Sequence, residues 1–196
     1  MKKKLSLIAV MALSVVCLTG CGIVTVVPIG EEASFTGEEV FDSGAESSGD
    51  WTAVVEEITG AAKDLAEVMN GDGIGSGSVA VSGTASIVEF NTETPKYYLL
   101  ITPDGYSGSE EFRIQAGGVY SGTAVRDAQT VKVFEDFTNQ TEWSQYAKAL
   151  NEQVDAQVVA PLALDGSAAG KTVTFVGAAV QSGDTVTITP VSLTVE

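Results

Sequence analysis

The sequence predicts one domain of mixed α and β structure and mainly β character, either an α+β domain or a small β-barrel with helical additions. Two stretches, residues 51–69 and 140–159, carry apolar residues at helical spacing. Between and after them lie short runs rich in Val, Ile, Thr and Tyr that end at Gly, Pro, Asn or Asp, as short antiparallel strands do. The order of helix, strands, helix and strands therefore predicts two helices packed on mostly antiparallel strands.

The N-terminal residues have the pattern of a secretory signal. Lysines at 2–4 precede an apolar run at 5–18, which is shorter than the roughly 20 residues that a spanning helix needs. Thr19 and Gly20 then stand before Cys21, and this small-small-Cys ending resembles the bacterial lipoprotein signal. We therefore expect Cys21 to become the lipidated first residue of the mature protein. The alternative is an ordinary signal peptide that ends near a cysteine by chance.

The residues that follow Cys21 are predicted to form a tether. Residues 22–30 form a short extended apolar piece, and residues 30–50 are rich in Glu, Ser and Gly, as solvated linkers are. Phe35, Val40 and Phe41 indicate that part of the tether packs on the domain. The predicted division is a signal peptide at 1–20, a lipidated N-terminus with an acidic tether at 21–49, and one domain at 50–196.

The charge of the chain argues against nucleic acid as a partner. All 26 acidic residues but only seven of the ten basic ones follow the predicted signal, so the mature chain carries a net charge of −19. A phosphate-binding surface needs clustered Lys and Arg, whereas these seven are scattered between Lys63 and Lys171. No polybasic patch attracts anionic lipid either. The predicted membrane attachment therefore depends on the lipid at Cys21.

Missing residue types exclude whole classes of chemistry. The chain has no His, and its two cysteines are Cys17, which would leave with the signal, and Cys21. Catalysis by His-containing triads, Cys nucleophiles, disulfides and His- or Cys-ligated metal sites are therefore excluded. Carboxylate pairs, Ser-Lys dyads and oxygen-ligated Ca²⁺ or Mg²⁺ remain as options that no pattern supports, and among 26 acidic residues the proximity of two carries little information. We expect a protein that is not an enzyme and that holds no cofactor or metal.

The first helix is predicted over residues 51–69, with Asp50 as its N-cap and Gly71 as its C-terminal stop. Its apolar face indicates packing on the core. The following residues 70–75 resemble a calcium loop only superficially, because Ile74 stands where an oxygen ligand belongs and no Glu closes the loop.

The first group of strands follows this helix. Turn residues at 91–95 and 103–105 separate the runs that alternate or are rich in β-branched residues. The predicted strands are residues 79–90, 96–102 and 111–116, and two further extended segments are predicted at residues 120–125 and 130–134, on either side of Arg126-Asp127.

The second helix is predicted over residues 140–159. Asn139 as N-cap and Glu142 three residues later make a capping-box pattern. Trp143 and Tyr146 belong to the apolar face, so core packing is expected for both.

The last strands are predicted at residues 172–180, 185–189 and 191–195, with a hairpin turn at Gly183-Asp184. Residues 166–172 resemble a phosphate-binding Walker loop. They lack one of the four residues required between the glycines, and they precede a strand where the motif requires a helix. Nucleotide binding is therefore not expected.

Several blocks of the sequence resemble one bacterial lipoprotein family. In chain order they are Val26-Val27-Pro28-Ile29, Phe35-Thr36-Gly37 with Phe41 and Trp51, GTAVRD at 122–127, FEDFTNQ at 134–140, Ala149-Leu150-Asn151, and GKTV at 170–173 with Phe175-Val176-Gly177. Through these blocks the chain is similar to the family catalogued as Domain of Unknown Function 2291, over nearly the whole mature chain. The Arg-Asp and Phe-Thr-Asn-Gln blocks are the specific ones, and residues 71–111 show no distinctive match.

The resemblance implies a cell-envelope lipoprotein on the extracytoplasmic face of the membrane, with an oligonucleotide/oligosaccharide-binding-like (OB-like) barrel. It also implies a gene that often lies beside an ATP-driven (ABC) importer of simple sugars of the ribose and xylose type. It implies no biochemical activity. The fold name does not bring nucleic-acid binding with it, because a fold does not determine a function and the charge of the chain opposes that ligand.

Arg126 and Asp127 are the most specific candidates for a functional site. Neighbours on a strand face opposite sides, so we expect the two not to pair with each other. Arg126 in an acidic chain is expected to find another carboxylate and to fix a helix against the barrel. The alternative is that Arg126 binds sugar hydroxyls or an acidic group of a partner.

The other candidates lie on the second helix. Asn139 and Gln140 have structural interpretations as its cap and first-turn residue. Trp143 is expected in the core in preference to stacking on a sugar ring. Asn151 is less well explained, since Asn is a poor helix former, and we expect it to bond to the barrel.

Three functions from different classes follow. The leading one is a non-enzymatic accessory lipoprotein that contacts the binding protein or permease of a sugar importer. The second is direct binding of a small sugar or oligosaccharide in a barrel-mouth pocket lined by Arg126, Asp127, Asn139 and Gln140. The least favoured is a carboxylate-based hydrolase, because no spacing identifies an acid and a base.

Overall fold

The computed structural model describes residues 41–196, which form one compact unit, Phe41–Glu196. The predicted signal peptide at 1–20, Cys21 and the tether up to residue 40 lie outside the described residues. In chain order the elements are α3 (Ser43–Ala61), β1 (Lys63–Asp64), α4 (Leu65–Asn70), β2 (Val79–Asn91), β3 (Lys96–Pro103), β4 (Glu111–Gly118), α5 (Ala124–Asp127), the 3-10 turn η1 (Phe134–Asp136), α6 (Gln140–Val154), the π-helical turn η2 (Asp155–Val159), the 3-10 turns η3 (Ala160–Leu162) and η4 (Gly166–Ala168), β5 (Thr172–Ser182) and β6 (Thr185–Val195).

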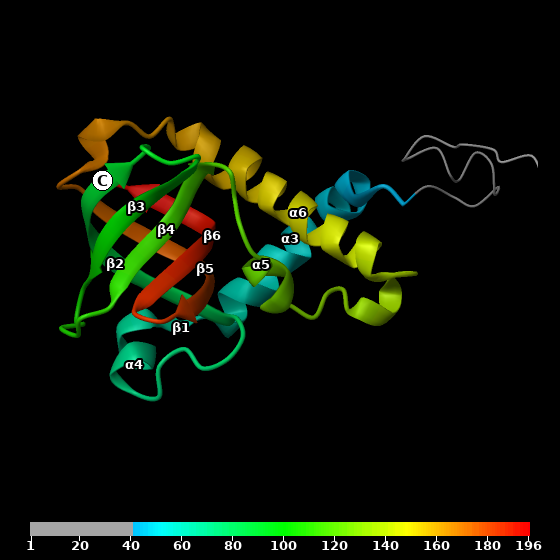
Figure 1. Cartoon of the computed structure of the whole chain (residues 1–196), viewed down its shortest axis with the longest axis horizontal. Coiled ribbons are helices and arrows are strands. Elements are labelled where there is room, and N and C mark those ends of the chain that lie inside the picture. The colour runs from blue at the N-terminus through cyan, green and yellow to red at the C-terminus, as the bar shows by residue number, and fades with distance from the viewer. Residues whose placement is uncertain (1–40) are drawn as a thin grey trace, which may run out of the picture. The chain divides into compact units, whose positions relative to one another are not determined.

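Five strands close into a barrel in the order β2-β3-β4-β6-β5, and β5 pairs back to β2 (Figure 1). The contact between β4 and β6 is parallel, and the other four contacts are antiparallel. The two residues of β1 add a short parallel pairing to β2. The predicted small, mostly antiparallel barrel is therefore confirmed, with an N-terminal helix and a second helix between strands β4 and β5.

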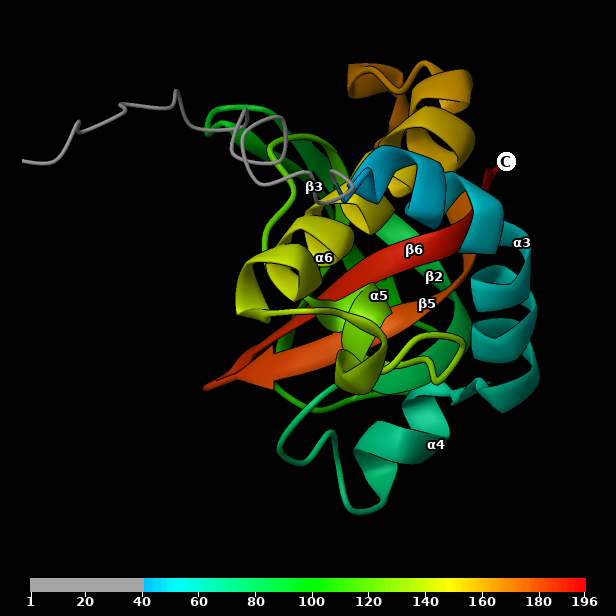
Figure 2. The same cartoon turned by 90° about the vertical axis from the view of Figure 1, so that its right-hand side faces the viewer.

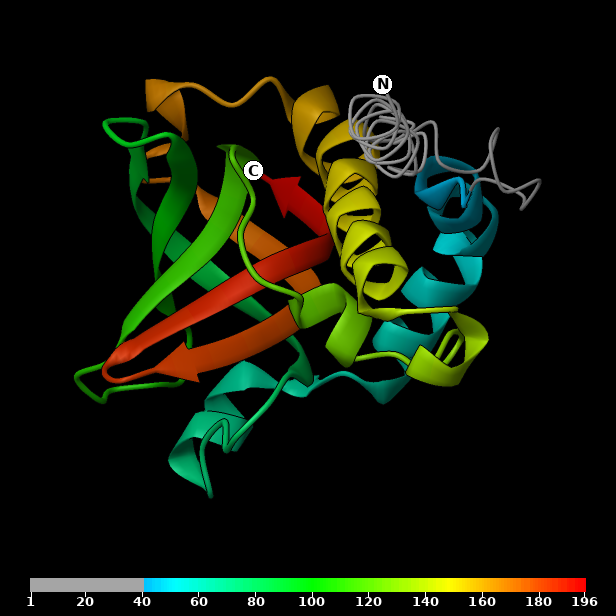
Figure 3. The same cartoon turned by 45° about the vertical axis from the view of Figure 1, so that its right-hand side comes forward.

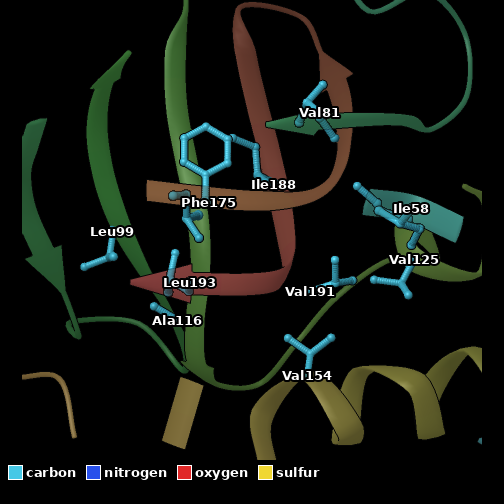
Figure 4. Close-up of a cluster of buried hydrophobic side chains, with 14 of the residues drawn as sticks. Ile58, Val81, Leu99, Ala116, Val125, Val154, Phe175, Ile188, Val191 and Leu193 are labelled. Carbon is cyan, nitrogen blue, oxygen red and sulfur yellow. The ribbon is translucent and has the colours of Figure 1, made fainter. Parts of the chain in front are cut away.

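Apolar residues of alternating strand positions fill the barrel. Leu99 on β3, Phe175 on β5 and Ile188 on β6 are at most 1% exposed, and Figure 4 shows them between the strands. This alternation is why a one-residue register shift would expose the whole set. The hydrophobic effect thus sets which side of each strand faces inward.

A second part of the core joins the barrel to the helices. Figure 4 shows Ile58 of α3, Val125 of α5 and Val154 of α6 around Val191 of β6, and all four are buried. The pairing of β5 with β6 skips Val191, because Gly177 pairs with Pro190 and Val176 with Ser192. A bulge of this kind re-aims one side chain, and here it directs Val191 toward the helices.

Helices α3 and α6 lie side by side along the barrel (Figure 3). They contact β2, β5 and β6, and α5 lies across β5 and β6 (Figure 2). Among the described elements no helix makes more than marginal contact with β3. The outer surface of β3 is therefore left open, whereas its neighbour β4 contacts the turn η2.

The first helix begins eight residues before the predicted start. Asp42, and not Asp50, is the N-cap, and its Oδ1 accepts hydrogen bonds from the backbone N–H groups of Gly44 and Ala45 at 3.0 Å. The prediction was wrong because residues 43–50 carry Ser, Gly and Glu, which give no apolar period. The small Ser47 is nevertheless fully buried and forms a 3.5 Å hydrogen bond with Gln153 of α6. Residues assigned to the tether thus belong to the helix.

The predicted helix over residues 51–69 is also interrupted. α3 ends at Ala61, and α4 begins after Asp64, which caps it by accepting from the Glu67 N–H at 3.0 Å. Between them Lys63 and Asp64 pair with β2, so a tertiary contact breaks the apolar period. The predicted stop at Gly71 is confirmed as the C-cap of α4.

The segments predicted as extended at 120–125 and 130–134 are not strands. The first ends in the short helix α5, and the second runs into the turn η1. In the second segment, two side chains satisfy backbone N–H groups in place of a sheet. The Glu57 carboxylate accepts from Thr130 and Val131, and Gln129 Oε1 accepts from Lys132.

The second helix is confirmed, since α6 and η2 together cover residues 140–159. Asn139 caps α6, with its Oδ1 accepting from the backbone N–H groups of Thr141 and Glu142. Glu142 reaches back to the N–H of Thr138. The described residues contain no helix that is both long and apolar enough to cross a bilayer.

The last two predicted strands are one strand, β6, which carries Pro190 opposite Gly177. A Cβ at Gly177 would lie 2.5 Å from the Thr189 carbonyl oxygen, so only glycine allows this close approach. The hairpin turn at Gly183 is confirmed, with a left-handed φ of 59°.

Candidate functional site

Arg126 and Asp127 pair with each other, contrary to the prediction. They lie on α5 and not on a strand, which brings Arg126 Nη2 to 2.7 Å and Nε to 2.8 Å from Asp127 Oδ1. The guanidinium also lies 4.4 Å from the centre of the Trp143 ring, and its Nη1 donates to the Trp143 carbonyl oxygen at 3.3 Å. Arg126 therefore joins α5 to α6 through Trp143, whereas the expected ion pair with another carboxylate, fixing a helix against the barrel, is not what the structure shows.

Trp143 belongs to an aromatic cluster at one end of α6. Its ring lies 5.0 Å from Phe137 and is stacked on Tyr146 at 6.1 Å. Phe41 meets Phe137 at 5.5 Å, so the chain preceding α3 joins the same cluster. The Tyr146 hydroxyl donates to Asp50 Oδ2 at 3.0 Å, and burial followed by the Asp50 charge raises the pKa of Tyr146. This cluster locks α3, α6 and the 134–139 segment together.

Asn139 and Gln140 are exposed at the start of α6, where Asn139 is engaged as the cap. Asn151 lies three turns further along, is only 8% exposed, and donates from Nδ2 to the Gly122 carbonyl oxygen at 3.1 Å. We expected Asn151 to bond to the barrel, but its partner Gly122 lies in the loop between β4 and α5.

The sequence-derived candidates therefore do not converge on one pocket. Arg126, Asp127 and Trp143 come together, whereas Asn139 and Gln140 form the end of a helix. None of these five borders the hollows lined by Val119 and Asp155, by Leu162 and Lys171, or by Tyr98 and Arg113. Arg126, Asp127 and Trp143 contact one another, and Asn139 caps α6, so these four have structural roles within the described chain.

One hollow lies on the surface of β3 and β4. It has a volume of about 530 Å³ and is bordered by the loop before β3, by Lys96, Tyr98 and Arg113, and by Val119. The Arg113 guanidinium lies 4.5 Å from the centre of the Tyr98 ring and also pairs with Glu111. Val119 is 54% exposed, a high value for an aliphatic side chain.

Two glycines shape the turn that borders this hollow. Gly117 and Gly118 have φ values of 114° and 68°, and these left-handed conformations turn the chain away from β4. A Cβ at Gly118 would lie 2.2 Å from the Pro95 carbonyl oxygen, to which the Val119 N–H donates at 2.7 Å. The turn therefore holds Val119 against the loop before β3.

Sequence reasoning missed Tyr98 and Arg113. Arg113 lies between buried neighbours on β4, which could have identified it as outward-facing, whereas Tyr98 follows the exposed Tyr97. Only the register of the β3–β4 pairing places the two side chains near each other. The described residues contain no group of three or more acidic or Cys side chains arranged to hold a metal ion.

The chain was compared with known proteins. A family profile described as "Predicted periplasmic lipoprotein (DUF2291)" matches residues 11–194. Among solved structures, an OB-fold protein from Thermotoga maritima is similar with a TM-score of 0.60 and 16% sequence identity, over 81% of this chain and all of the other. At that identity the likeness shows the fold alone. No curated protein matches the chain.

Proposed function

The chain belongs to the family of predicted periplasmic lipoproteins DUF2291, and from that premise we propose that it is a non-enzymatic accessory component of a simple-sugar ABC importer. As a lipoprotein it is lipid-anchored on the extracytoplasmic face of the membrane. There the binding protein and the permease of an importer meet. Resemblance to the family implies a gene beside importers of the ribose and xylose type, which motivates the choice of partner.

The observation that carries the proposal is the open outer surface of β3, next to β4. β2 to β6 take the places of the five strands of an OB barrel, so β3 and β4 are its second and third strands. In OB barrels these strands, with the adjoining loops, present the binding surface. Here α3, α5 and α6 cover β2, β5 and β6, and the turn η2 contacts β4, so that the outer surface of β3 is left free.

The chemistry of this surface suits a protein partner. Arg and Tyr are enriched at the energetic centres of protein interfaces, and Arg113 stacked on Tyr98 offers both at one point. Lys96 adds a second positive charge in an otherwise acidic chain. A partner that places a carboxylate near these cations and an apolar side chain on Val119 fits the hollow.

Site-specific photocrosslinking in cells tests the proposal. A photoreactive phenylalanine analogue is introduced in place of Lys96, in the hollow, in the full-length lipoprotein. The matched control replaces Lys63, another exposed lysine, on β1, which pairs with β2 and not with β3 or β4. We expect the Lys96 position to give a crosslink to the importer's binding protein or permease, identified by mass spectrometry, and the Lys63 position to give none.

An Arg113→Glu variant completes the test. Reversing that charge should weaken the Lys96 crosslink by about tenfold, because like charges then face each other across the interface. Repeated absence of importer components from the Lys96 adducts, in cells that express the importer, would contradict the proposal. So would equal crosslinking from both positions.

A further inference from the structure

A second hollow, of about 320 Å³, lies between the chain that follows β4 and the C-terminal half of α6. Val119 and Tyr120 form one wall, and Lys148, Asn151, Glu152 and Asp155 form the other. The β3–β4 hollow shares only Val119 with it. This volume is at the small end of the range for ligand pockets in proteins.

The fold holds both walls in place. On one side the glycine turn and the hydrogen bond from Val119 to Pro95 fix the backbone. On the other side residues spaced three and four apart share one face of α6. The π-helical turn η2 begins at Asp155, and π-turns within helices occur frequently at functional sites.

Two polar oxygens at this hollow have no partner within the described chain. Asn151 is more than nine-tenths buried and uses its Nδ2 on Gly122, whereas its Oδ1 accepts no hydrogen bond from any described residue. Asp155 accepts the Tyr120 hydroxyl at 3.2 Å with Oδ1, and its Oδ2 accepts none among the same residues. No side-chain oxygen or nitrogen of the described residues is both inaccessible and unpaired, so Asn151 Oδ1, which accepts no hydrogen bond there, is in contact with solvent.

The remaining groups define what kind of ligand fits. Lys148 supplies a donor at the rim and is paired with Glu152 at 3.6 Å, so the hollow offers both donors and acceptors. Hydroxyl groups suit such a set because each one donates and accepts. An anion would face Asp155 and Glu152, whereas the Val119 side chain and Tyr120 ring offer apolar surface. Burial and the Asp155 charge raise the pKa of Tyr120, which keeps its hydroxyl protonated as the donor to Asp155.

We propose that this hollow binds a small neutral polyhydroxylated molecule, a cyclic sugar or polyol. Its hydroxyl groups donate to Asn151 Oδ1 and Asp155 Oδ2 and accept from Lys148, and its apolar face lies on Val119 and Tyr120. The site differs from the pocket expected from the sequence, which Arg126 and Asn139 were to line. This proposal goes beyond the docking role of the β3–β4 surface, and its test does not use the importer. The failure of one proposal therefore leaves the other unaffected.

Calorimetric titration of residues 22–196, which include the whole compact unit, tests the site. The probes are D-xylose, D-glucose and myo-inositol, with tetramethylammonium chloride as a cationic probe. We expect at least one of the three polyols to bind, with amide NMR shifts confined to the Val119–Tyr120 and Lys148–Asp155 segments. Binding of the cation alone, or of none of the probes, would overturn the proposal.

Two variants locate the binding. Asp155→Asn keeps the shape of the side chain, and Lys148→Met alters a side chain that is 81% exposed and therefore has little effect on folding. Each should weaken polyol binding by about tenfold, the loss expected for a hydrogen bond to a charged group. The matched control is Lys171→Met, another exposed lysine outside the hollow, which should bind as the unaltered protein does. Polyol binding that persists in both variants would place the ligand elsewhere and overturn the assignment.

Discussion

At the residue scale, a neighbouring pair of opposite charges behaves differently from its sequence expectation. Arg126 and Asp127 were expected on opposite faces of a strand, but a helical turn brings their side chains together. Arg126 also contacts Trp143, and its side chain is only 13% exposed. An ion pair this sheltered, with its cation stacked on an indole, contributes more than an exposed pair does.

Arg126→Ala should therefore lower the free energy of unfolding by about 1–2 kcal/mol, because both the Trp143 contact and the Asp127 pair are lost. For a chain of this size that is a fall of roughly 2–8 °C in Tm. Thermal unfolding followed by Trp fluorescence measures it. Arg113→Ala is the control, since Arg113 also lies on an aromatic ring but is 38% exposed, and it should cost less than half as much. Equal losses would contradict the structural role of Arg126.

At the element scale, α3 holds the long connection between α5 and α6 through one carboxylate. Glu57 Oε1 accepts from the Thr130 N–H at 2.9 Å and from the Thr130 hydroxyl at 2.7 Å, and Oε2 accepts from the Val131 N–H at 3.1 Å. The connection needs this partner because residues 128–133 form no helix or strand. A side chain from a distant element thus replaces the regular backbone pairing.

Glu57→Ala should destabilise the protein by about 1–2 kcal/mol, since several hydrogen bonds to a charged group are lost at a partly exposed site. Urea unfolding measures the loss, and hydrogen exchange should accelerate at the amides of Thr130 and Val131. The neighbouring Glu56 is exposed and has no such contacts among the described residues. The free energy of unfolding of Glu56→Ala should therefore stay within about 0.5 kcal/mol of that of the unaltered protein. A comparable loss in both variants would contradict the role of Glu57 in holding the connection between α5 and α6.

At the scale of the whole molecule, buried tyrosines couple stability to high pH. The pKa values of Tyr120 and Tyr146 are both raised by burial and then by the charges of Asp155 and Asp50. The folded state therefore holds these phenolic protons more tightly than the unfolded state does. Their contribution to stability is complete below the unfolded pKa of about 10 and is lost as the pH rises above it.

The free energy of unfolding should thus fall steeply above about pH 10, and unfolding should release phenolic protons. Urea titrations at increasing pH, with phenolate absorbance as the second readout, measure both effects. Tyr146→Phe should lower stability at neutral pH by about 1 kcal/mol, through loss of the bond to Asp50, and should make the alkaline decline shallower. Ionisation of all five tyrosines together near pH 10 in the folded protein would contradict this expectation.

Prediction from the sequence succeeded where the physical cause is local. Asn139 as a cap, Gly71 as a stop and the Gly183 hairpin follow from the chemistry of a few adjacent residues. It failed at α5 and at the start of α3. At α5 the contact with Trp143 of α6 lies outside the local sequence. At α3 the cap Asp42 is local, but the polar residues after it give no apolar period, and Ser47 is buried against α6 only in the folded domain.

The sequence by itself located the segments that form the five barrel strands, although it divided β6 in two and added two segments that are not strands, and it located the second helix and indicated the lipoprotein family. Periodic burial and turn chemistry act over a few residues, so they can be read from the chain directly. Only the tertiary structure decided how the barrel closes, through the parallel contact of β4 with β6 and the pairing of β5 with β2. That closure leaves Tyr98 and Arg113 on an open surface and brings Tyr120 to Asp155 at the second hollow. Such contacts join residues far apart in the chain, and they form only when the whole apolar core is buried.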